Sequence, residues 1–451
     1  MFKSIKKFFA PAPHRERLPA GQIDRKYRRC RIQILESTFM GYAMFYLCRN
    51  SLSAVAKEMG PALEYSHAMI GNILACTAIA YGIGKFLMGS LSDRSNPRKF
   101  MATGLFLTAC LNFAFGSSTN YTMHMLLWAL NGLVQGMGWP PCGRSIGHWY
   151  GVHERGAVFA VWNIAHNVGG GIAGIIAASA AARFGWQSAF YVPGAICLVG
   201  SLYLLWRLRD TPQSEGLPPI EAYHNDYTDD ELAHGKDTHE AELSTRELFV
   251  DNILKNRLLW VFAAANFFVY IVRYSMLDWG PLYLSEVKGA NLEDGGLAIL
   301  MVNFGGIPST LLLGWLSDRV GGRRGLVSLA CMFPIVLAFM AILWNPPGRL
   351  AVDMAALAVI GFFIYPPVML LGVAALDLTS KKAVGTAAGF IGLFGYIGRT
   401  AQAKGFGWMA DHFSATHGQV EAWNFVIWSI IACTLVAIVL LFFTRNVRPR
   451  G

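Results

Sequence analysis

The chain has 451 residues, of which 54% are hydrophobic and only 15% charged, and its mean hydropathy is +0.38. A soluble globular protein carries about a quarter charged residues, so this composition excludes an ordinary soluble domain and indicates a polytopic α-helical membrane protein. The net charge of +10 requires no nucleic-acid partner, because basic loops on one side of a membrane account for it.

The eight cysteines are scattered, mostly in apolar segments, and no C-x-x-C pair occurs. We interpret them as small buried residues rather than as disulfides or metal ligands. His224, His234 and His239 fall in a polar stretch, where a metal site and a solvated loop both fit the spacing and the loop is the simpler interpretation. The sequence thus predicts neither a metal nor a cofactor.

In chain order, the first 30 residues are basic and polar, which is typical of a cytoplasmic tail near anionic lipid headgroups. About twelve apolar runs of membrane-spanning length follow. Their approximate ranges are 32–57, 67–91, 100–118, 122–147, 157–183, 187–207, 257–283, 293–316, 325–344, 350–376, 384–410 and 422–444.

A polar stretch separates two sets of six runs. We therefore predict an all-α membrane protein with twelve transmembrane helices in two pseudo-symmetric halves. Residues 1–208 form the N-terminal tail and first six-helix half, 209–255 a cytoplasmic linker, and 256–451 the second six-helix half and tail. Lysine and arginine are concentrated on the side of the tails and the linker, so the positive-inside rule places both termini in the cytoplasm.

The strongest site candidate is the pattern Y-x-x-R-x-S, which occurs at residues 46–51 in the first span and 270–275 in the seventh. An arginine inside a membrane helix is costly and a functional candidate by default. Two arginines at matched repeat positions indicate one site built from two halves. We predict that Arg49 and Arg273 face each other and hold an anionic, phosphorylated substrate. A snorkelling or ion-paired arginine is the competing interpretation.

Two further repeats keep nearly the same spacing in both halves. G-x-L-S-D-R occupies residues 89–94 and 314–319, and Trp139-Pro140-Pro141 is echoed by Tyr365-Pro366-Pro367. This shared register predicts two parallel six-helix halves related by an axis along the membrane normal.

The repeated G-x-L-S-D-R loop resembles the signature of the major facilitator superfamily. Five further stretches resemble the organophosphate:phosphate antiporter family, namely 92–98, 137–144, 162–171, 210–213 and 385–390. The resemblance covers essentially the whole chain, and it is closest to the bacterial members that carry glycerol-3-phosphate. It implies a transporter rather than an enzyme, in the bacterial inner membrane, and we expect a monomer in the lipid bilayer.

In that family the positions of Arg49 and Arg273 bind the phosphate group. Lys85 matches a pore lysine, although its place near a helix end also fits snorkelling. His166 matches a pore position, while an isolated helix histidine is more often a core residue. Pore-lining aromatic positions of the family correspond to Tyr42, Tyr46, Tyr81, Trp139, Trp162, Tyr270, Tyr365 and Tyr396. Tyr46 and Tyr270 are the stronger candidates, because each precedes an arginine by about one turn on the same helix face.

The sequence departs from the glycerol-phosphate pattern at three places. Asn50 replaces a lysine that, in the family, pairs with a carboxylate at the position of Asp278, and Asn303 replaces an acidic residue. The eleventh span carries Arg399 and Lys404, and hexose-phosphate carriers have a lysine at the position of Lys404. Snorkelling is again the competing interpretation.

The expected function is exchange of an organic phosphate ester for inorganic phosphate by alternating access. Glycerol-3-phosphate is the first expectation, and hexose 6-phosphate, phosphoglycerate or a sugar-phosphate sensor role in the same family are the alternatives. Bound anion would neutralise the two arginines, whereas the empty site would keep uncompensated charge and reorient slowly. We expect no catalytic residue.

Overall fold

The computed structural model describes residues 7–93, 95–224, 254–378 and 384–448. Within them the chain is helical and contains no β-strand, and nine helices are long and apolar enough to cross a membrane. The predicted all-α membrane fold is confirmed. The helices are α2 (Ala20–Leu47), α3 (Ser51–Leu63), α4 (His67–Asp93), α5 (Pro97–Gly116), α6 (Tyr121–Gln135), α7 (Trp139–Trp149), α8 (Val152–Phe184), α9 (Ser188–Arg207), η1 (Pro212–Glu215), α10 (Ile220–His224), α12 (Arg257–Lys288), α13 (Leu292–Arg319), α14 (Arg324–Trp344), α15 (Leu350–Asp377), α16 (Val384–His417) and α17 (Gln419–Thr444).

Two of the predicted spans are broken. The structure corrects the continuous helices predicted at 32–57 and 122–147, since α2 gives way to α3 around Arg49 and α6 gives way to α7 at residues 136–138. With each broken pair counted as one span, α2–α9 and α12–α17 supply six spans each, as predicted.

The second break has a clear physical cause. Gly136 lies against the backbone of α4, and a Cβ there would be 2.6 Å from the carbonyl carbon of Gly84. Pro140 follows in the first turn of α7, where a residue without an N–H is tolerated because that donor has no intrahelical partner. Within a continuous helix, Pro140 would instead remove a backbone hydrogen bond and break the helix.

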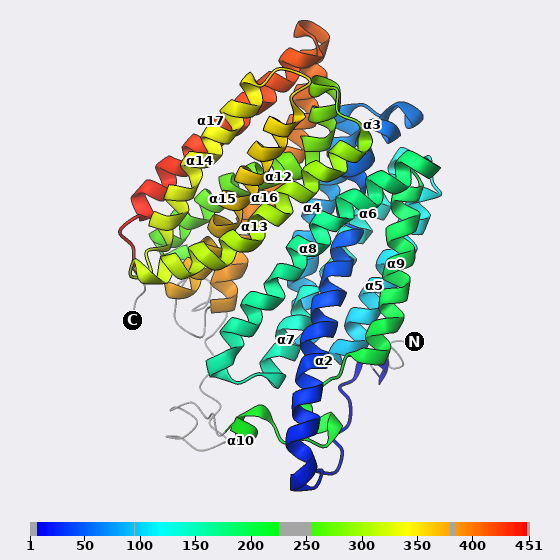
Figure 1. The fold of residues 1–451 in the computed structure, drawn as a ribbon, viewed down its shortest axis with the longest axis vertical. Helices are drawn as coiled ribbons and strands as arrows, with labels where there is room; N and C mark the ends of the chain where they lie inside the picture. The colour runs from blue at the N-terminus through cyan, green and yellow to red at the C-terminus, as the bar shows by residue number, and fades with distance from the viewer. Residues whose placement is uncertain (1–6, 94, 225–253, 379–383, 449–451) are drawn as a thin grey trace.

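The helices form two groups that stand side by side (Figure 1). We call α2–α9 the N-terminal group and α12–α17 the C-terminal group. The end of the molecule where α2 begins and α17 ends is the terminal end, and the opposite end is the distal end. Each group has its own buried apolar residues, with Phe45 and Trp149 in the first and Phe262 and Phe339 in the second.

The two groups pack closely in the distal half of the molecule. There α4 crosses α16 and α8 crosses α13 with backbone against backbone. A Cβ on Gly174 would lie 2.8 Å from the carbonyl oxygen of Gly296, and one on Gly71 would clash with the carbonyl oxygen of Ala403. Such approach is possible only for residues without side chains, so the groups are closed against each other at the distal end.

The N-terminal tail folds against the start of the predicted linker. The amide of Ala12 donates to Asp210 Oδ2 at 2.7 Å, and the amide of Leu18 donates to the carbonyl of Gly216 at 2.9 Å. Tyr27 stacks on Tyr223 with ring centroids 4.1 Å apart. The rest of the linker from residue 225 to 253, including His234 and His239, lies outside the described residues.

The distal contact predicts a strict requirement for glycine at position 71. We expect Gly71→Ala to lower the melting temperature, because overpacking a close contact costs about 1–3 kcal/mol. The matched control is Gly405→Ala on α16, where an added Cβ meets no atom within 4 Å and alanine favours the helix by about 0.5–1 kcal/mol. Thermal unfolding of both variants in one detergent is the measurement. A Gly71→Ala protein that melts at or above the wild-type temperature would contradict the packing.

Candidate functional site

The two repeated arginines lie in the protein interior. Arg49 occupies the break between α2 and α3, and Arg273 lies in the middle of α12; their exposed fractions are 6% and 7%. Arg49 lies against the ring of Tyr46 and Arg273 against that of Tyr365, and the ring of His166 is 5.8 Å from the first ring and 5.6 Å from the second. The structure therefore brings one arginine from each group into a single cluster, and neither side chain faces the lipid.

Tyrosine rings surround both guanidinium groups. The Cζ atom of Arg49 lies 4.0 Å from the ring centroid of Tyr46 and 4.5 Å from that of Tyr81. The Cζ atom of Arg273 lies 4.7 Å from the ring centroid of Tyr365, and Tyr274 and Tyr270 flank it at 5.1 and 5.8 Å. Ring faces attract cations without neutralising them.

The two arginines differ in their polar partners. Arg49 donates from Nε and Nη2 to Oε1 of Gln135 at 3.2 and 2.9 Å, and Gln135 donates in turn to the carbonyl of Phe45 at 2.9 Å. Among the described residues no carboxylate or amide oxygen accepts from Arg273, and its buried Nε has no partner. A buried cation without a carboxylate partner is costly, which makes Arg273 receptive to an anion.

Gln135 was missed by the sequence interpretation. It is the last residue of α6, and its place directly before the break fixes the amide oxygen beside Arg49. A polar residue at the end of an otherwise apolar run, next to Gly136, was the available signal.

His166 of α8 lies between the two groups. Its ring centroid is 5.8 Å from that of Tyr46 and 5.6 Å from that of Tyr365. Nδ1 is hydrogen-bonded to the carbonyl oxygen of Asn163, so Nδ1 is the protonated nitrogen. Nε2 therefore accepts a hydrogen bond when the imidazole is neutral and donates one when the imidazole is protonated.

The other predicted aromatic residues extend this cluster. Tyr270 meets Tyr396 edge to face at 5.5 Å, and Tyr396 lies 5.0 Å from Tyr81 across the boundary between the groups. On the other side, Trp162 stacks on Tyr42 at 4.8 Å and contacts Trp139 at 6.2 Å. These rings form a continuous series of aromatic contacts from one group to the other.

Two predicted lysines lie differently. Lys85 is exposed, and its Nζ is 5.8 Å from the ring of Trp139, at the edge of the cluster toward the terminal end. Lys404 is exposed on α16, and its electrostatic neighbour is Cys76. Among the described residues no contact joins Lys404 to either arginine or to the tyrosines around them, so it is the predicted site residue that the structure does not bring to the cluster.

Arg399, on the same helix, is buried in the interior, whereas Lys404 is exposed. Five residues along an α-helix rotate a side chain by about 140°, so the two cations face different directions. Arg399 is 3% exposed, and its Cζ lies 4.0 Å from the ring of Tyr274. It donates to Asp278 Oδ1 at 3.1 Å, and Gln402 donates to Asp278 Oδ2 at 2.7 Å.

This ion pair settles which cation accompanies Asp278. Asn50 instead donates to the carbonyl of Gly170 at 3.3 Å, and Asn303 accepts from the hydroxyl of Tyr365 at 2.8 Å. Asp278 forms its ion pair with Arg399. The buried cations that have no carboxylate partner in the described part of the chain are therefore Arg49 and Arg273.

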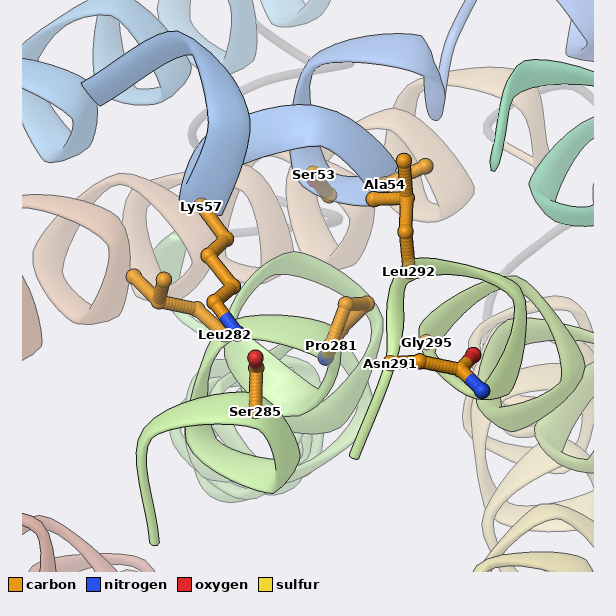
Figure 2. Close-up of a pocket in the computed structure, with 9 residues that line it drawn as sticks. All are labelled: Ser53, Ala54, Lys57, Pro281, Leu282, Ser285, Asn291, Leu292 and Gly295. Atoms are coloured by element: carbon orange, nitrogen blue, oxygen red, sulfur yellow. The ribbon is translucent and has the colours of Figure 1, made fainter. Parts of the chain in front are cut away.

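A separate pocket lies nearer the distal end, where α3 of one group faces α12 and α13 of the other (Figure 2). Its polar lining includes Ser53, Lys57, Ser285 and Asn291. None of the candidate site residues lines it. The described residues also contain no group of three or more histidine, cysteine or acidic side chains arranged to hold a metal ion.

Comparison with known proteins agrees with this geometry. Residues 38–403 match the family model described as Major Facilitator Superfamily. The chain is 43% identical to the glycerol-3-phosphate transporter of Bacillus subtilis (strain 168), covering 98% of both chains. It is 39% identical to a probable hexose phosphate transport protein of Chlamydia pneumoniae, covering 99% of this chain and 98% of the other.

Among solved structures, the fold resembles a bacterial homolog of the human lysosomal transporter Spinster in an inward-facing, unoccupied conformation. The TM-score is 0.77 at 16% identity, over 92% of this chain and 97% of the other. These matches confirm the expectation that the chain is a multi-pass membrane transporter rather than an enzyme. The chain belongs to the organophosphate:phosphate antiporter family of the major facilitator superfamily.

Proposed function

We propose that this protein takes up an organic phosphate ester, with glycerol-3-phosphate as the first candidate, in exchange for inorganic phosphate. The observation that carries the proposal is the pair Arg49 and Arg273, buried among tyrosines and without a carboxylate partner in the described residues. Its relatives named for glycerol-3-phosphate and hexose phosphate transport support the same class of substrate.

The chemistry of the pair matches a phosphoryl group. A phosphate monoester carries about −1.5 to −2 charges at neutral pH and three strong acceptor oxygens. Each guanidinium fork can donate two parallel hydrogen bonds to such a group. Two arginines therefore balance one dianion. The ring of His166 lies beside that of Tyr365, and its Nε2 adds a donor to the phosphoryl group when the ring is protonated, whereas the hydroxyl of Tyr365 already donates to Asn303.

Transport follows from where the pair sits. Arg49 belongs to the N-terminal group and Arg273 to the C-terminal group, so a bound anion holds both groups together at the centre. Rocking of one group against the other exposes this site alternately to each side of the membrane. The empty site keeps two uncompensated buried charges, which oppose reorientation, so one phosphate compound must replace another before the site returns.

Lys404 was the main sequence argument for a hexose phosphate, and the side chain lies away from the cluster. A phosphoglycerate adds a carboxylate, for which the nearest interior cation, Arg399, is already paired with Asp278. Both observations favour a small ester with a neutral polyol part, as in glycerol-3-phosphate. Hexose 6-phosphate is the second candidate because its extra part is also neutral.

We further propose that residues 1–208 and 256–451 move as two rigid halves joined by the linker 209–255, in a monomer. The terminal end is assigned to the cytoplasm of a bacterium and the bilayer to its inner membrane. Exposed basic side chains of the tail, among them Arg15, Arg17 and Arg25, support this orientation through the positive-inside rule.

Replacing either arginine by lysine tests the phosphate pair. Arg49→Lys and Arg273→Lys each keep the charge but lose the bidentate fork, and we expect phosphate exchange to fall by at least about tenfold in each. The control is Arg183→Lys, an exposed position at the distal end of α8. The measurement is counterflow of labelled phosphate in proteoliposomes against glycerol-3-phosphate, glucose 6-phosphate, 3-phosphoglycerate and sulfate. Undiminished exchange in both variants would contradict the proposal.

The tether on Arg49 provides a second test. Gln135→Glu places a carboxylate where the amide oxygen now accepts from Arg49, so an internal ion pair competes with the ligand. We expect the Kd for inorganic phosphate, measured by titration calorimetry, to rise by about tenfold or more. Gln135→Met, the uncharged control of similar length, loses less affinity. Equal affinity in the glutamate variant and the wild type would show that Arg49 does not bind phosphate.

The proposed exchange must also be obligatory. We expect uptake of labelled glycerol-3-phosphate into vesicles loaded with phosphate and almost none into vesicles loaded with chloride, because chloride cannot neutralise both arginines in the same way. Equal uptake in the two preparations would refute exchange. Tight binding of the ester without uptake in either preparation would instead identify the protein as a sensor.

A further inference from the structure

A second charged cluster joins the two groups at the distal end, away from the arginine site. His67 is the first residue of α4 in the N-terminal group. Three residues of the C-terminal group meet it: Glu286 near the end of α12, Asp411 on α16 and Trp423 on α17. We call these four residues the distal lock.

Hydrogen bonds concentrate on the His67 imidazole. Nδ1 is 2.6 Å from Asp411 Oδ1, and Nε2 is 3.0 and 3.1 Å from the two oxygens of Glu286. The amides of His67 and Ala68 donate to the two oxygens of Asp411 at 3.0 and 2.7 Å. Asp411 therefore caps the N-terminus of a helix in the opposite group, where a negative charge is favoured.

Trp423 completes the lock from a third helix. Its Nε1–H donates to Glu286 Oε2 at 2.7 Å, and its ring meets the His67 ring edge to face at 5.9 Å. The side chains of His67, Glu286 and Asp411 are 20%, 15% and 28% exposed, so the lock is shielded yet within reach of solvent protons.

The geometry sets the number of protons in the lock. A neutral imidazole has one N–H, whereas both ring nitrogens of His67 face carboxylate oxygens. An ionised carboxylate can accept a hydrogen bond but cannot donate one. The second contact is a hydrogen bond only if the ring is an imidazolium or one carboxyl group is protonated. Either way, the lock holds one proton more than a neutral histidine beside two ionised carboxylates.

We propose that the distal lock is a proton-binding site that must take up one proton to close the distal end and that releases it on opening. Opening separates α4 from α12 and α16, because His67 is in one group and both carboxylates are in the other. The freed imidazole returns to water, where its pKa is about 6.5. This inference rests on the alternating opening proposed above.

The sign of the pH dependence follows from proton counting. The closed state binds one more proton than the open state, so low pH favours closure and rising pH favours opening. Because opening releases one proton, the ratio of open to closed molecules rises by up to tenfold per pH unit above about pH 6.5.

Glu286 and Asp411 are the charged groups with the largest effect on His67, and α17 contributes the neutral Trp423 and Gln419. The nearby Lys288 is turned away from the lock, since its Nζ donates to the carbonyls of Ile342 and Asn345.

The test measures the distance between the groups directly. Spin labels are placed on exposed distal positions, at Thr119 in the N-terminal group and Val420 in the C-terminal group, after replacement of the eight native cysteines. Double electron–electron resonance on the full-length protein in lipid nanodiscs, without substrate, then gives the open and closed populations. We expect the open-to-closed ratio to rise by about tenfold or more between pH 6 and pH 8.

Two variants separate proton binding from simple loosening. His67→Gln keeps one donor but cannot titrate, and its ratio is expected to change by less than twofold over the same range. Trp423→Phe removes the donor to Glu286 and leaves the titrating group, so it raises the open fraction at every pH with the wild-type slope. If His67→Gln does not fold, Asp411→Asn replaces it, with a reduced slope expected.

A wild-type ratio that changes less than twofold between pH 6 and pH 8 would overturn the proposal. So would a full wild-type slope in His67→Gln or in Asp411→Asn. Because the measurement contains no substrate, these outcomes leave phosphate exchange untouched. A failure of phosphate exchange with an intact pH slope would refute the proposed function and keep the lock.

Discussion

Two guanidinium groups are buried at the centre of the protein without a carboxylate partner in the described residues. Burying such a charge is costly, and the protein meets that cost with tyrosine rings and, for Arg49 alone, with the amide of Gln135. The centre of the protein therefore carries two positive charges that no carboxylate among the described residues neutralises. Asp278, the carboxylate nearest in sequence to Arg273, is held away from that role by Arg399 and Gln402.

Two charged clusters lie between the groups, one at the centre and one at the distal end. In the proposed mechanism the arginines hold the groups together at the centre when an anion is bound, whereas His67 contacts Glu286 and Asp411 at the distal end without a ligand. Close backbone packing at Gly71 and Gly174 adds contacts that do not depend on charge. The distal closure thus combines packing that does not depend on charge with the proposed proton-binding contact, and the proposed central contact requires the ligand.

The internal repeat and the apolar runs were sufficient to predict the helical fold, the two sets of six spans and the meeting of Arg49 with Arg273, because membrane length and charge cost act locally along the sequence. The break at Gly136 was missed because it depends on backbone contact with α4, which is distant in the sequence. The break at Arg49 was also missed; there Asn131 and Gln135 of α6 donate to the carbonyls of Cys48 and Phe45. Lys404 was predicted in the site because hexose-phosphate carriers have a lysine at the matching position, and in the structure this side chain is exposed on α16. The distal lock joins His67 to residues more than 200 positions away in the sequence. No sequence motif indicates this contact, so it was not predicted.

An experimental structure of the protein with inorganic phosphate bound would show whether both arginines share one phosphoryl group. We expect phosphate oxygens within about 3 Å of guanidinium nitrogens of both Arg49 and Arg273. Phosphate bound to one of these arginines alone, or to Arg399 or Lys404 in their place, would contradict this expectation.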